Sequence, residues 1–318
     1  MSRLAVMAAA MAAFVPAAAG AMDKVRELDS VKESFDVFPV HQAAEEGFFK
    51  QQDLDVDIIF GQGGASALQA IITGSRDVGV GIGSLAVIAA YSKGAPLVIL
   101  GNTFKGADNE LWYVRADSPI KTVKDLDGKT MVYSSPGSTS HIAAQYILKT
   151  SGVKAKLVSV GGMAASRTAV MSGQVDTGWL GAPSYMNLVR KGEARIIVGG
   201  DQAGELRSMT IRVVVANRNW VEKHRDVAKR FMKAFWQGRE FNYSGEKAIE
   251  RYAKTWNMEM EDARLATKYV PPATTVLEVG NLPGVVRLAQ EYKFLKGPLT
   301  KAQTDKLIDY VYLPGRDK

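Results

Sequence analysis

Three turns rich in glycine and serine each separate a short apolar run from a pattern typical of a helix. They occupy residues 62–66, 134–140 and 161–164. The first backbone N–H groups of a helix have no partner within the helix and lie at the positive end of its dipole. Such turns therefore bind small anions or polar head groups well. We interpret them as loops that hold one small molecule in a shared crevice.

Side chains in and beside these turns are candidates for ligand contact. Gly63 and Gly64 permit close approach of a ligand to the backbone. Residues 138–140 gather three hydroxyls, of which one is needed to cap the helix that follows. Trp179 ends an apolar run and offers a wall for an apolar ligand body, and Arg212 can bind a carboxylate through two hydrogen bonds. The expected ligand-binding residues are Ser34, Phe35, Phe38, Gln62, Gly63, Gly64, Ala65, Gly83, Ser84, Ser138, Thr139, Ser140, Gly162, Met163, Trp179 and Arg212.

Residues arranged for catalysis or metal binding are not found in the sequence. His41, His141 and His224 are the only histidines, and none has metal-ligand spacing with another. Ser140 and His141 are neighbours on one expected helix and point to different faces, which separates a nucleophile from its base. Residues 127–130 resemble the end of a phosphate-binding loop, but the first glycine is missing. We expect no catalytic residue, no metal and no cofactor.

The N-terminal residues have the features of a secretory signal peptide. Arg3 is followed by an apolar run over residues 4–15 and by small residues at 19–21. This run is too short to span a membrane, so we expect cleavage near Ala21 and release into the periplasm. The chain contains no cysteine, which excludes a disulfide framework and a lipid-modified cysteine after cleavage.

The composition predicts a globular protein of about two domains. The 318 residues are 47% hydrophobic and 23% charged, and the net charge is +7. The basic residues are spread along the chain without interleaved aromatics, so we do not expect nucleic-acid binding. The apolar stretch over residues 78–101 is interrupted by polar residues and by a turn at 94–96, so we expect no membrane span there.

Strand-like and helix-like segments alternate, which predicts an α/β fold. We expect strands at 25–31, 56–60, 78–81, 98–100, 111–114, 130–133, 156–160, 178–180, 196–198 and 210–215. A first helix opens at Pro39 and ends before Gly47. Further helices are expected at 65–73, 85–92, 140–150, 165–172, 184–190, 219–243, 246–256, 260–269, 285–292 and 301–310.

Two extended runs, residues 111–115 and 209–216, are suited to cross between two lobes. We then expect a signal peptide over residues 1–21, a discontinuous first lobe over 22–111 and 213–318, and a second lobe over 112–212. Open α/β sheets bind ligands at the ends of their strands. The ligand would therefore lie between the lobes, and its binding would drive a hinge closure.

A series of short motifs resembles the nitrate/sulfonate/taurine-type substrate-binding proteins of ABC importers. The motifs lie in order at residues 46–50, 53–56, 63–64, 77–79, 93–94, 123–129, 137–140 and 171–176. The resemblance covers nearly the whole mature chain. It implies a two-lobed periplasmic-binding-protein fold of type II, in which each lobe is a mixed, mostly parallel sheet flanked by helices and two strands cross between the lobes. It also implies a monomer that delivers a small-molecule ligand to an inner-membrane permease and its ATPase subunit.

The resemblance leaves the ligand open among sulfonate, nitrate, carboxylate, aromatic acid and pyrimidine. Phe35, Phe38 and Trp179 favour a partly apolar body over nitrate, although the position of Phe38 favours packing beneath the first helix over ligand contact. Asp36 would disfavour a bare anion at the cleft. The alternatives are a protein that binds or makes thiamine pyrimidine precursors and a sensor's ligand-binding module. The synthases of fungal type use a cysteine-rich iron site, which this chain cannot form without cysteine.

Overall fold

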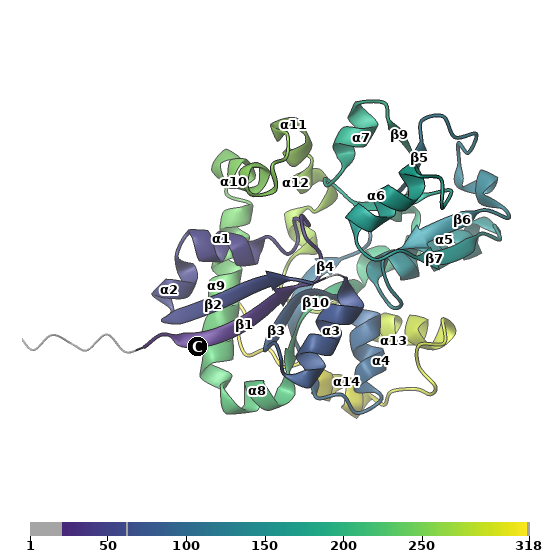
Figure 1. Cartoon of the computed structure of the whole chain (residues 1–318). Helices are drawn as coiled ribbons and strands as arrows, with labels where there is room; N and C mark the ends of the chain where they lie inside the picture. The colour runs from purple at the N-terminus through teal and green to yellow at the C-terminus, as the bar shows by residue number, and fades with distance from the viewer. Residues whose placement is uncertain (1–20, 62, 317–318) are drawn as a thin grey trace, which may run out of the picture.

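The computed structural model describes residues 21–61 and 63–316. The predicted signal peptide lies outside the described residues except for Ala21, and so does the predicted ligand-binding residue Gln62. The described chain forms two groups of strands, each flanked by helices (Figure 1). Within the described ranges, no helix has both the length and the hydrophobicity needed to cross a membrane.

The first lobe, as we name it, is built on a five-stranded sheet with the order β2-β1-β3-β10-β4. The strand β1 pairs parallel with both β2 and β3, whereas β10 pairs antiparallel with both β3 and β4. The late strand β10 is thus inserted between two early ones, so two distant chain segments build this lobe. The strands are β1 Asp23–Asp29, β2 Leu54–Phe60, β3 Val78–Gly83, β4 Leu97–Lys105 and β10 Thr210–Asn217.

The second lobe, as we name it, contains a three-stranded sheet with the order β8-β5-β9 and a two-stranded sheet β6-β7. The strands β6 and β7 are parallel. The strand β5 enters from the first lobe and runs antiparallel to both β8 and β9. The strands are β5 Glu110–Arg115, β6 Thr130–Tyr133, β7 Lys156–Ser159, β8 Gly178–Gly181 and β9 Ala194–Gly199.

Helices cover both faces of the first lobe's sheet (Figure 1). One face is covered by α1 Pro39–Glu45, α2 Phe48–Gln51 and α9 Arg225–Asn242, and the other by α3 Gly64–Thr73, α4 Ser84–Tyr91 and α13 Leu282–Glu291. The second lobe carries α5 Thr139–Ser151, α6 Met163–Met171 and α7 Met186–Arg190. The remaining helices are α8 Arg218–Lys223, α10 Glu246–Trp256, α11 Met260–Ala263, α12 Ala266–Tyr269, α14 Lys301–Leu307 and the 3₁₀ turns η1 Val123–Leu126, η2 Gly200–Gln202, η3 Gly204–Ser208 and η4 Pro272–Thr274.

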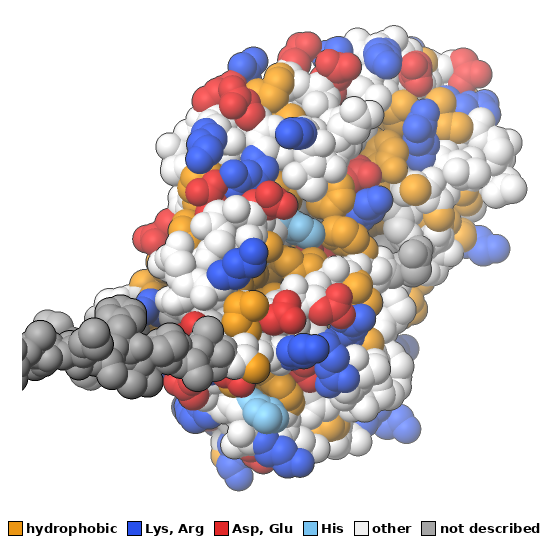
Figure 2. Space-filling model, turned by 60° about the vertical axis from the view of Figure 1, so that its left-hand side comes forward, with side chains coloured by type: hydrophobic (Ala, Val, Ile, Leu, Met, Phe, Trp, Pro, Cys, Tyr) orange, Lys and Arg blue, Asp and Glu red, His pale blue; other side chains and the backbone are white. Residues whose placement is uncertain are grey.

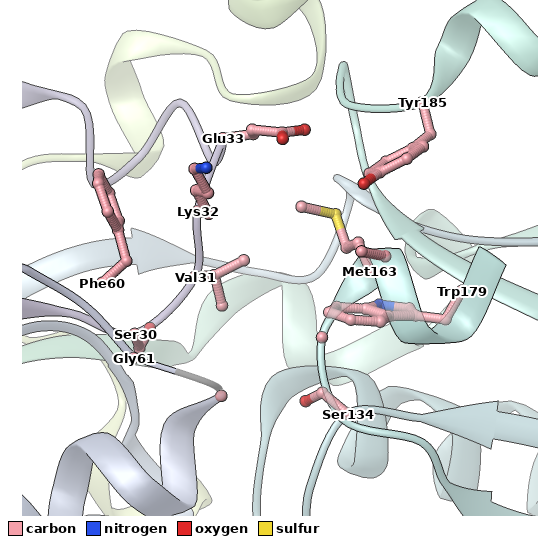
Figure 3. A pocket seen from close by; sticks show the side chains of 13 residues that line it. Ser30, Val31, Lys32, Glu33, Phe60, Gly61, Ser134, Met163, Trp179 and Tyr185 are labelled. Carbon is pink, nitrogen blue, oxygen red and sulfur yellow. The ribbon is translucent and has the colours of Figure 1, made fainter. Parts of the chain in front are cut away.

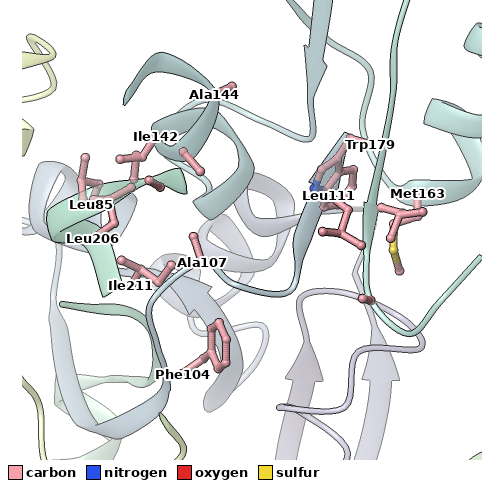
Figure 4. Close-up of a cluster of buried hydrophobic side chains, with 14 of the residues drawn as sticks. Leu85, Phe104, Ala107, Leu111, Ile142, Ala144, Met163, Trp179, Leu206 and Ile211 are labelled. Carbon is pink, nitrogen blue, oxygen red and sulfur yellow. The ribbon is translucent and has the colours of Figure 1, made fainter. Parts of the chain in front are cut away.

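The central strand β10 shows why this sheet needs cover on both sides. Val213 and Val215 belong to one apolar cluster, and Val214 and Ala216 belong to the other. Successive side chains of a strand point to opposite faces, so an unbroken apolar run is stable only between two layers of helices. The larger cluster continues from the first lobe into the second through the segment that contains Phe104 and Leu111 (Figure 4).

The predicted strands are confirmed in position, whereas some predicted helices are wrong. The single helix expected at 219–243 is two helices, α8 and α9, which meet at the non-helical His224 (φ −131°). The helix expected at 260–269 is the two short helices α11 and α12, and α7 begins two residues later than expected. The sequence has no glycine or proline at the break. We attribute the break to packing, since α8 contacts β10 whereas α9 contacts α1.

The predicted lobe boundaries fall inside β5 and β10. Each of these strands pairs within one sheet only. We therefore propose that the chain passes between the lobes just before each strand, through residues 106–109 and 200–209.

A substitution at Gly238 tests the packing between α1 and α9. A Cβ at this position would lie 2.1 Å from the Pro39 carbonyl oxygen and 2.9 Å from the Ala43 Cβ. Alanine normally stabilises a helix by about 1 kcal/mol relative to glycine, but here it would force the helices apart. We expect Gly238→Ala to lower the free energy of unfolding by about 1–3 kcal/mol in chemical denaturation.

The control is Glu240→Ala, on the exposed side of the same helix, which should change stability by less than about 0.5 kcal/mol. Unchanged or increased stability of Gly238→Ala would contradict the close packing.

Candidate functional site

A cleft lined by residues of both lobes is the candidate site. Figure 2 shows hydrophobic side chains gathered in the furrow between the two halves of the molecule, beside charged side chains of both signs. Its outer part, the outer pocket, has a volume of about 150 Å³. The lining residues, most of which Figure 3 labels, are Ser30, Val31, Lys32, Glu33, Phe60, Gly61 and Gly63 from the first lobe and Ser134, Gly162, Met163, Ala164, Trp179 and Tyr185 from the second.

A narrower inner pocket continues from the outer one. Both pockets share Ser30, Val31, Ser134 and Trp179, so they form one cleft. The inner pocket adds two kinds of residue, glycines that leave the backbone accessible and polar side chains. They are Gly64, Gly81, Gly83, Glu110, Ser138, Thr139, Ser140 and Arg212.

The cleft lies where parallel strands end and helices begin, which is the usual ligand site of open α/β sheets. The helices α3, α5 and α6 all direct their N-termini to it, because Gly64, Thr139 and Met163 are their first residues and line the cleft. Ser138 caps α5, and its Oγ accepts a hydrogen bond of 3.2 Å from the His141 N–H. The backbone N–H groups at the start of these three helices, which lack partners within their helices, therefore face the same cleft.

A buried ion cluster forms the floor of the inner pocket. The Arg212 guanidinium donates to Asp36 at 2.7 Å, to Glu110 and to the Thr139 hydroxyl at 3.2 Å. The Trp179 indole N–H donates to the same Glu110 carboxylate. Asp36 lies in the first lobe and Glu110 in the second, so Arg212 on β10 joins the two lobes.

One guanidinium in this cluster faces two carboxyl groups. Burial raises the pKa of the Glu110 carboxyl, although Arg212 opposes this effect. Burial alone would lower the pKa of Arg212, but Asp36 and Glu110 outweigh it and raise that pKa. Arg212 is therefore a structural cation whose charge is already compensated.

The structure brings most of the predicted ligand-binding residues into the cleft. Glycines and hydroxyls of the helix N-termini account for the larger part of them. Those that line it are Gly63, Gly64, Gly83, Ser138, Thr139, Ser140, Gly162, Met163, Trp179 and Arg212. Their contact with a ligand stays a prediction.

Phe35 and Phe38 do not line the cleft, contrary to the expectation from the sequence. Both are fully buried, and each packs edge-on against Tyr252 with ring centroids 5.0 Å apart. The reason is that the loop after β1 directs these aromatic side chains toward α10. This helix is distant in the sequence and is brought beneath the loop by the tertiary structure.

Three further predicted residues also lie outside the pocket lining. Ser34 is buried and donates a hydrogen bond of 2.5 Å to Asp36. The Ser84 hydroxyl donates to the Thr210 carbonyl at 2.9 Å. Ala65 is exposed on α3. These side chains support or flank the cleft and do not face it.

Several lining residues were not predicted from the sequence. Val31, Lys32 and Glu33 follow β1, and Phe60 ends β2, so their place after apolar runs was a usable signal. Tyr185 has no such signal, because the short segment before α7 brings it to the cleft.

The glycines, hydroxyls and helix N-termini of the cleft are suited to binding a small anion. Within the described part of the chain, no cluster of three or more histidine, aspartate or glutamate residues could hold a metal ion. The His141 ring stacks on Tyr133 with centroids 4.0 Å apart, and its Nδ1 accepts a hydrogen bond from the Gly137 N–H. Burial lowers the pKa of His141 to about 4, so the ring is neutral and holds the loop that precedes α5.

A substitution of Arg212 tests how much the buried ion cluster contributes to stability. Removing one partner of a buried ion pair costs about 3–5 kcal/mol, because the other charge stays uncompensated. We expect Arg212→Met to lose this much in urea denaturation, and the triple variant with Asp36→Asn and Glu110→Gln to recover most of it. Arg225→Met is the matched control, because the Arg225 side chain is 60% exposed in its pair with Asp309 and exposed pairs contribute at most about 1 kcal/mol. A loss below about 1 kcal/mol for Arg212→Met would contradict the role of the cluster.

A substitution of His141 tests how stability depends on pH. Its folded-state pKa of about 4 lies below the ordinary value of 6.5, so the unfolded chain takes up a proton first as the pH falls. The stability from the neutral ring is therefore complete above pH 6.5 and is lost between pH 6.5 and about 4. We expect His141→Gln to flatten the melting-temperature profile over this range, whereas His224→Gln, at an exposed position, should leave it unchanged. A wild-type slope in His141→Gln would refute the assignment.

Comparison with known proteins places the chain in a family. Residues 34–245 match the family described as "NMT1/THI5 like". A protein of Escherichia coli (strain K12) that is named for binding aliphatic sulfonates is 28% identical over 214 residues, 66% of this chain and 65% of that protein. The taurine-binding periplasmic protein of the same organism is 27% identical over 193 residues, 60% of this chain and 58% of that protein.

The chain thus spans less than two thirds of the length of these curated relatives. The structure of the alkanesulfonate-binding protein SsuA from Xanthomonas axonopodis pv. citri, bound to MOPS, shares the fold with a TM-score of 0.72. It is 21% identical, and the match covers 91% of this chain and 96% of that one. The fold is therefore that of the periplasmic binding proteins, and the chain belongs to the NMT1/THI5-like family.

Proposed function

We propose that this protein is the periplasmic solute-binding component of an ABC importer and captures a small organic acid, a sulfonate or carboxylate, between its lobes. The main support for the proposal is that the N-termini of three helices and the Trp179 indole all lie at one continuous cleft between the two lobes. The names of the sequence relatives, which refer to aliphatic sulfonates and taurine, support it.

The cleft offers different surroundings to the two ends of such a ligand. In our proposal the acid group lies in the inner pocket, where Ser138, Thr139 and Ser140 supply hydroxyls and the N–H groups that begin α5. The apolar body lies in the outer pocket against Val31 and Trp179. Arg212 orients Glu110 and Thr139 and does not supply a free positive charge.

Contacts across the cleft support closure by hinge motion. Ser184 of the second lobe donates to the Glu33 carbonyl of the first at 2.8 Å, and Arg190 on α7 pairs with Asp262 on α11 at 2.8 Å. A ligand that binds residues of both lobes favours the closed arrangement over an open one. In our proposal this closed monomer is what the permease and its ATPase subunit recognise.

The proposal predicts ligand-dependent stabilisation of the mature chain from Met22 onward. After unfolding and refolding to remove any bound solute, the protein would be melted with taurine, alkanesulfonates, nitrate, sulfate, carboxylates and aminopyrimidines. A ligand at ~100 times its dissociation constant adds about 2.7 kcal/mol of stability. We expect Trp179→Ala and Ser138→Ala to weaken binding of the best ligand, by about tenfold or more for the tryptophan, without unfolding the protein.

The control is Trp220→Ala, because Trp220 lies on α8 outside the cleft lining. Absence of any binder in the panel would contradict the proposed function. Unchanged affinity in both cleft variants would contradict the placement of the site.

A further inference from the structure

The backbone of Glu33 is held in an unusual conformation at the edge of the outer pocket. Its φ is +69°, in the left-handed region that residues other than glycine rarely occupy. Two hydroxyls hold its carbonyl oxygen in place: Ser184 donates to it at 2.8 Å and Tyr252 at 2.5 Å. A strained backbone conformation of this kind persists only where the surrounding structure holds it in place. Such conformations are common at functional sites.

The Glu33 side chain points into the cleft without a partner. Figure 3 shows its carboxylate extending across the pocket toward Tyr185. Within the described ranges, this carboxylate has neither an ion pair nor a hydrogen bond. Lys32 lies instead over the Phe60 ring, with its Nζ 5.9 Å from the ring centroid, and Arg167 lies over the Tyr185 ring at 6.0 Å. Lys32 and Arg167 therefore both contact aromatic rings.

The surroundings of Glu33 favour a positive group. Burial raises the pKa of its carboxyl, and the charge of Lys32 opposes this effect. A bound cation would oppose it further by favouring the charged form. The rings of Phe60, Trp179 and Tyr185 line the same pocket. Aromatic rings attract cations, and Lys32 and Arg167 already lie over two of these three.

We propose that Glu33 binds a protonated amine of the ligand. The inference rests on the proposed function and deepens it: the ligand is a zwitterion whose acid group lies at the helix N-termini of the inner pocket and whose ammonium group lies between Glu33 and the aromatic rings. An apolar body against Val31, Met163 and Trp179 separates the two ends. Glu33 thereby selects amino acids of this extended kind over simple organic acids.

The test uses pairs of probes that differ only in the amine. Isothermal titration calorimetry would compare 4-(aminomethyl)benzoate with 4-methylbenzoate and 3-aminopropanesulfonate with propanesulfonate. A hydrogen bond to a charged group predicts that the amine-bearing member of at least one pair binds about tenfold tighter or more. Glu33→Gln should abolish this preference and leave the affinity for the amine-free member within about threefold.

The matched control is Glu240→Gln, because Glu240 is exposed on α9 and lines neither the cleft nor the pocket next to it, so it should not affect the preference. Equal or tighter wild-type binding of the amine-free probes would overturn the inference, with no need for a variant. A preference that survives in Glu33→Gln would also overturn it. If the amine probes fail while an amine-free solute of the wider panel binds, the inference fails and the proposed function stands, whereas absence of all binding defeats both.

Discussion

The Arg212 guanidinium, shared by a carboxylate from each lobe, is the interaction on which the cleft depends. It is 6% exposed, and its partners Asp36 and Glu110 are fully buried. A charge cannot stay in such surroundings without partners, so the positions of all three groups are coupled. The lobes also approach closely beside it, since a Cβ on Gly83 would lie 2.8 Å from the Gly137 carbonyl oxygen. The floor of the cleft is therefore a rigid meeting point of the two lobes.

This constraint determines how the cleft can recognise a charged ligand. Because the two carboxylates use the charge of Arg212, a ligand's acid group depends on the N–H groups and hydroxyls at the start of α5 and its neighbours. The outer pocket is lined by one carboxylate, Glu33, and by one ammonium group, Lys32, which lies over the Phe60 ring. In our proposal, such a site recognises an acid and an amine at separate places along one cleft. Val31, Met163 and Trp179 lie between Glu33 and Ser134 (Figure 3).

The alternation of elements was predictable because it follows from local chemistry. The apolar runs that become strands such as β3 and β6, and the glycine-rich turns before α3 and α6, have periodicities and turn residues that depend on neighbours in sequence. The division at His224 was not predictable, because α8 and α9 separate only in response to the surfaces that each covers. Phe35 and Phe38 were misplaced for the same reason, since Tyr252, more than 200 residues away, receives their rings.

From the sequence alone one can therefore derive the α/β class, the turns that open helices, and the candidates Ser138, Met163 and Trp179 at strand and helix ends. Those features come from hydrogen-bonding needs and hydrophobic periodicity, which act over a few residues. The tertiary structure decided which charges meet. Asp36, Glu110 and Arg212 lie far apart in the chain, and only the insertion of β10 between β3 and β4 brings them together. The exposure of Glu33 to the cleft likewise depends on hydroxyls from Ser184 and Tyr252, because long-range contacts alone hold its backbone in place.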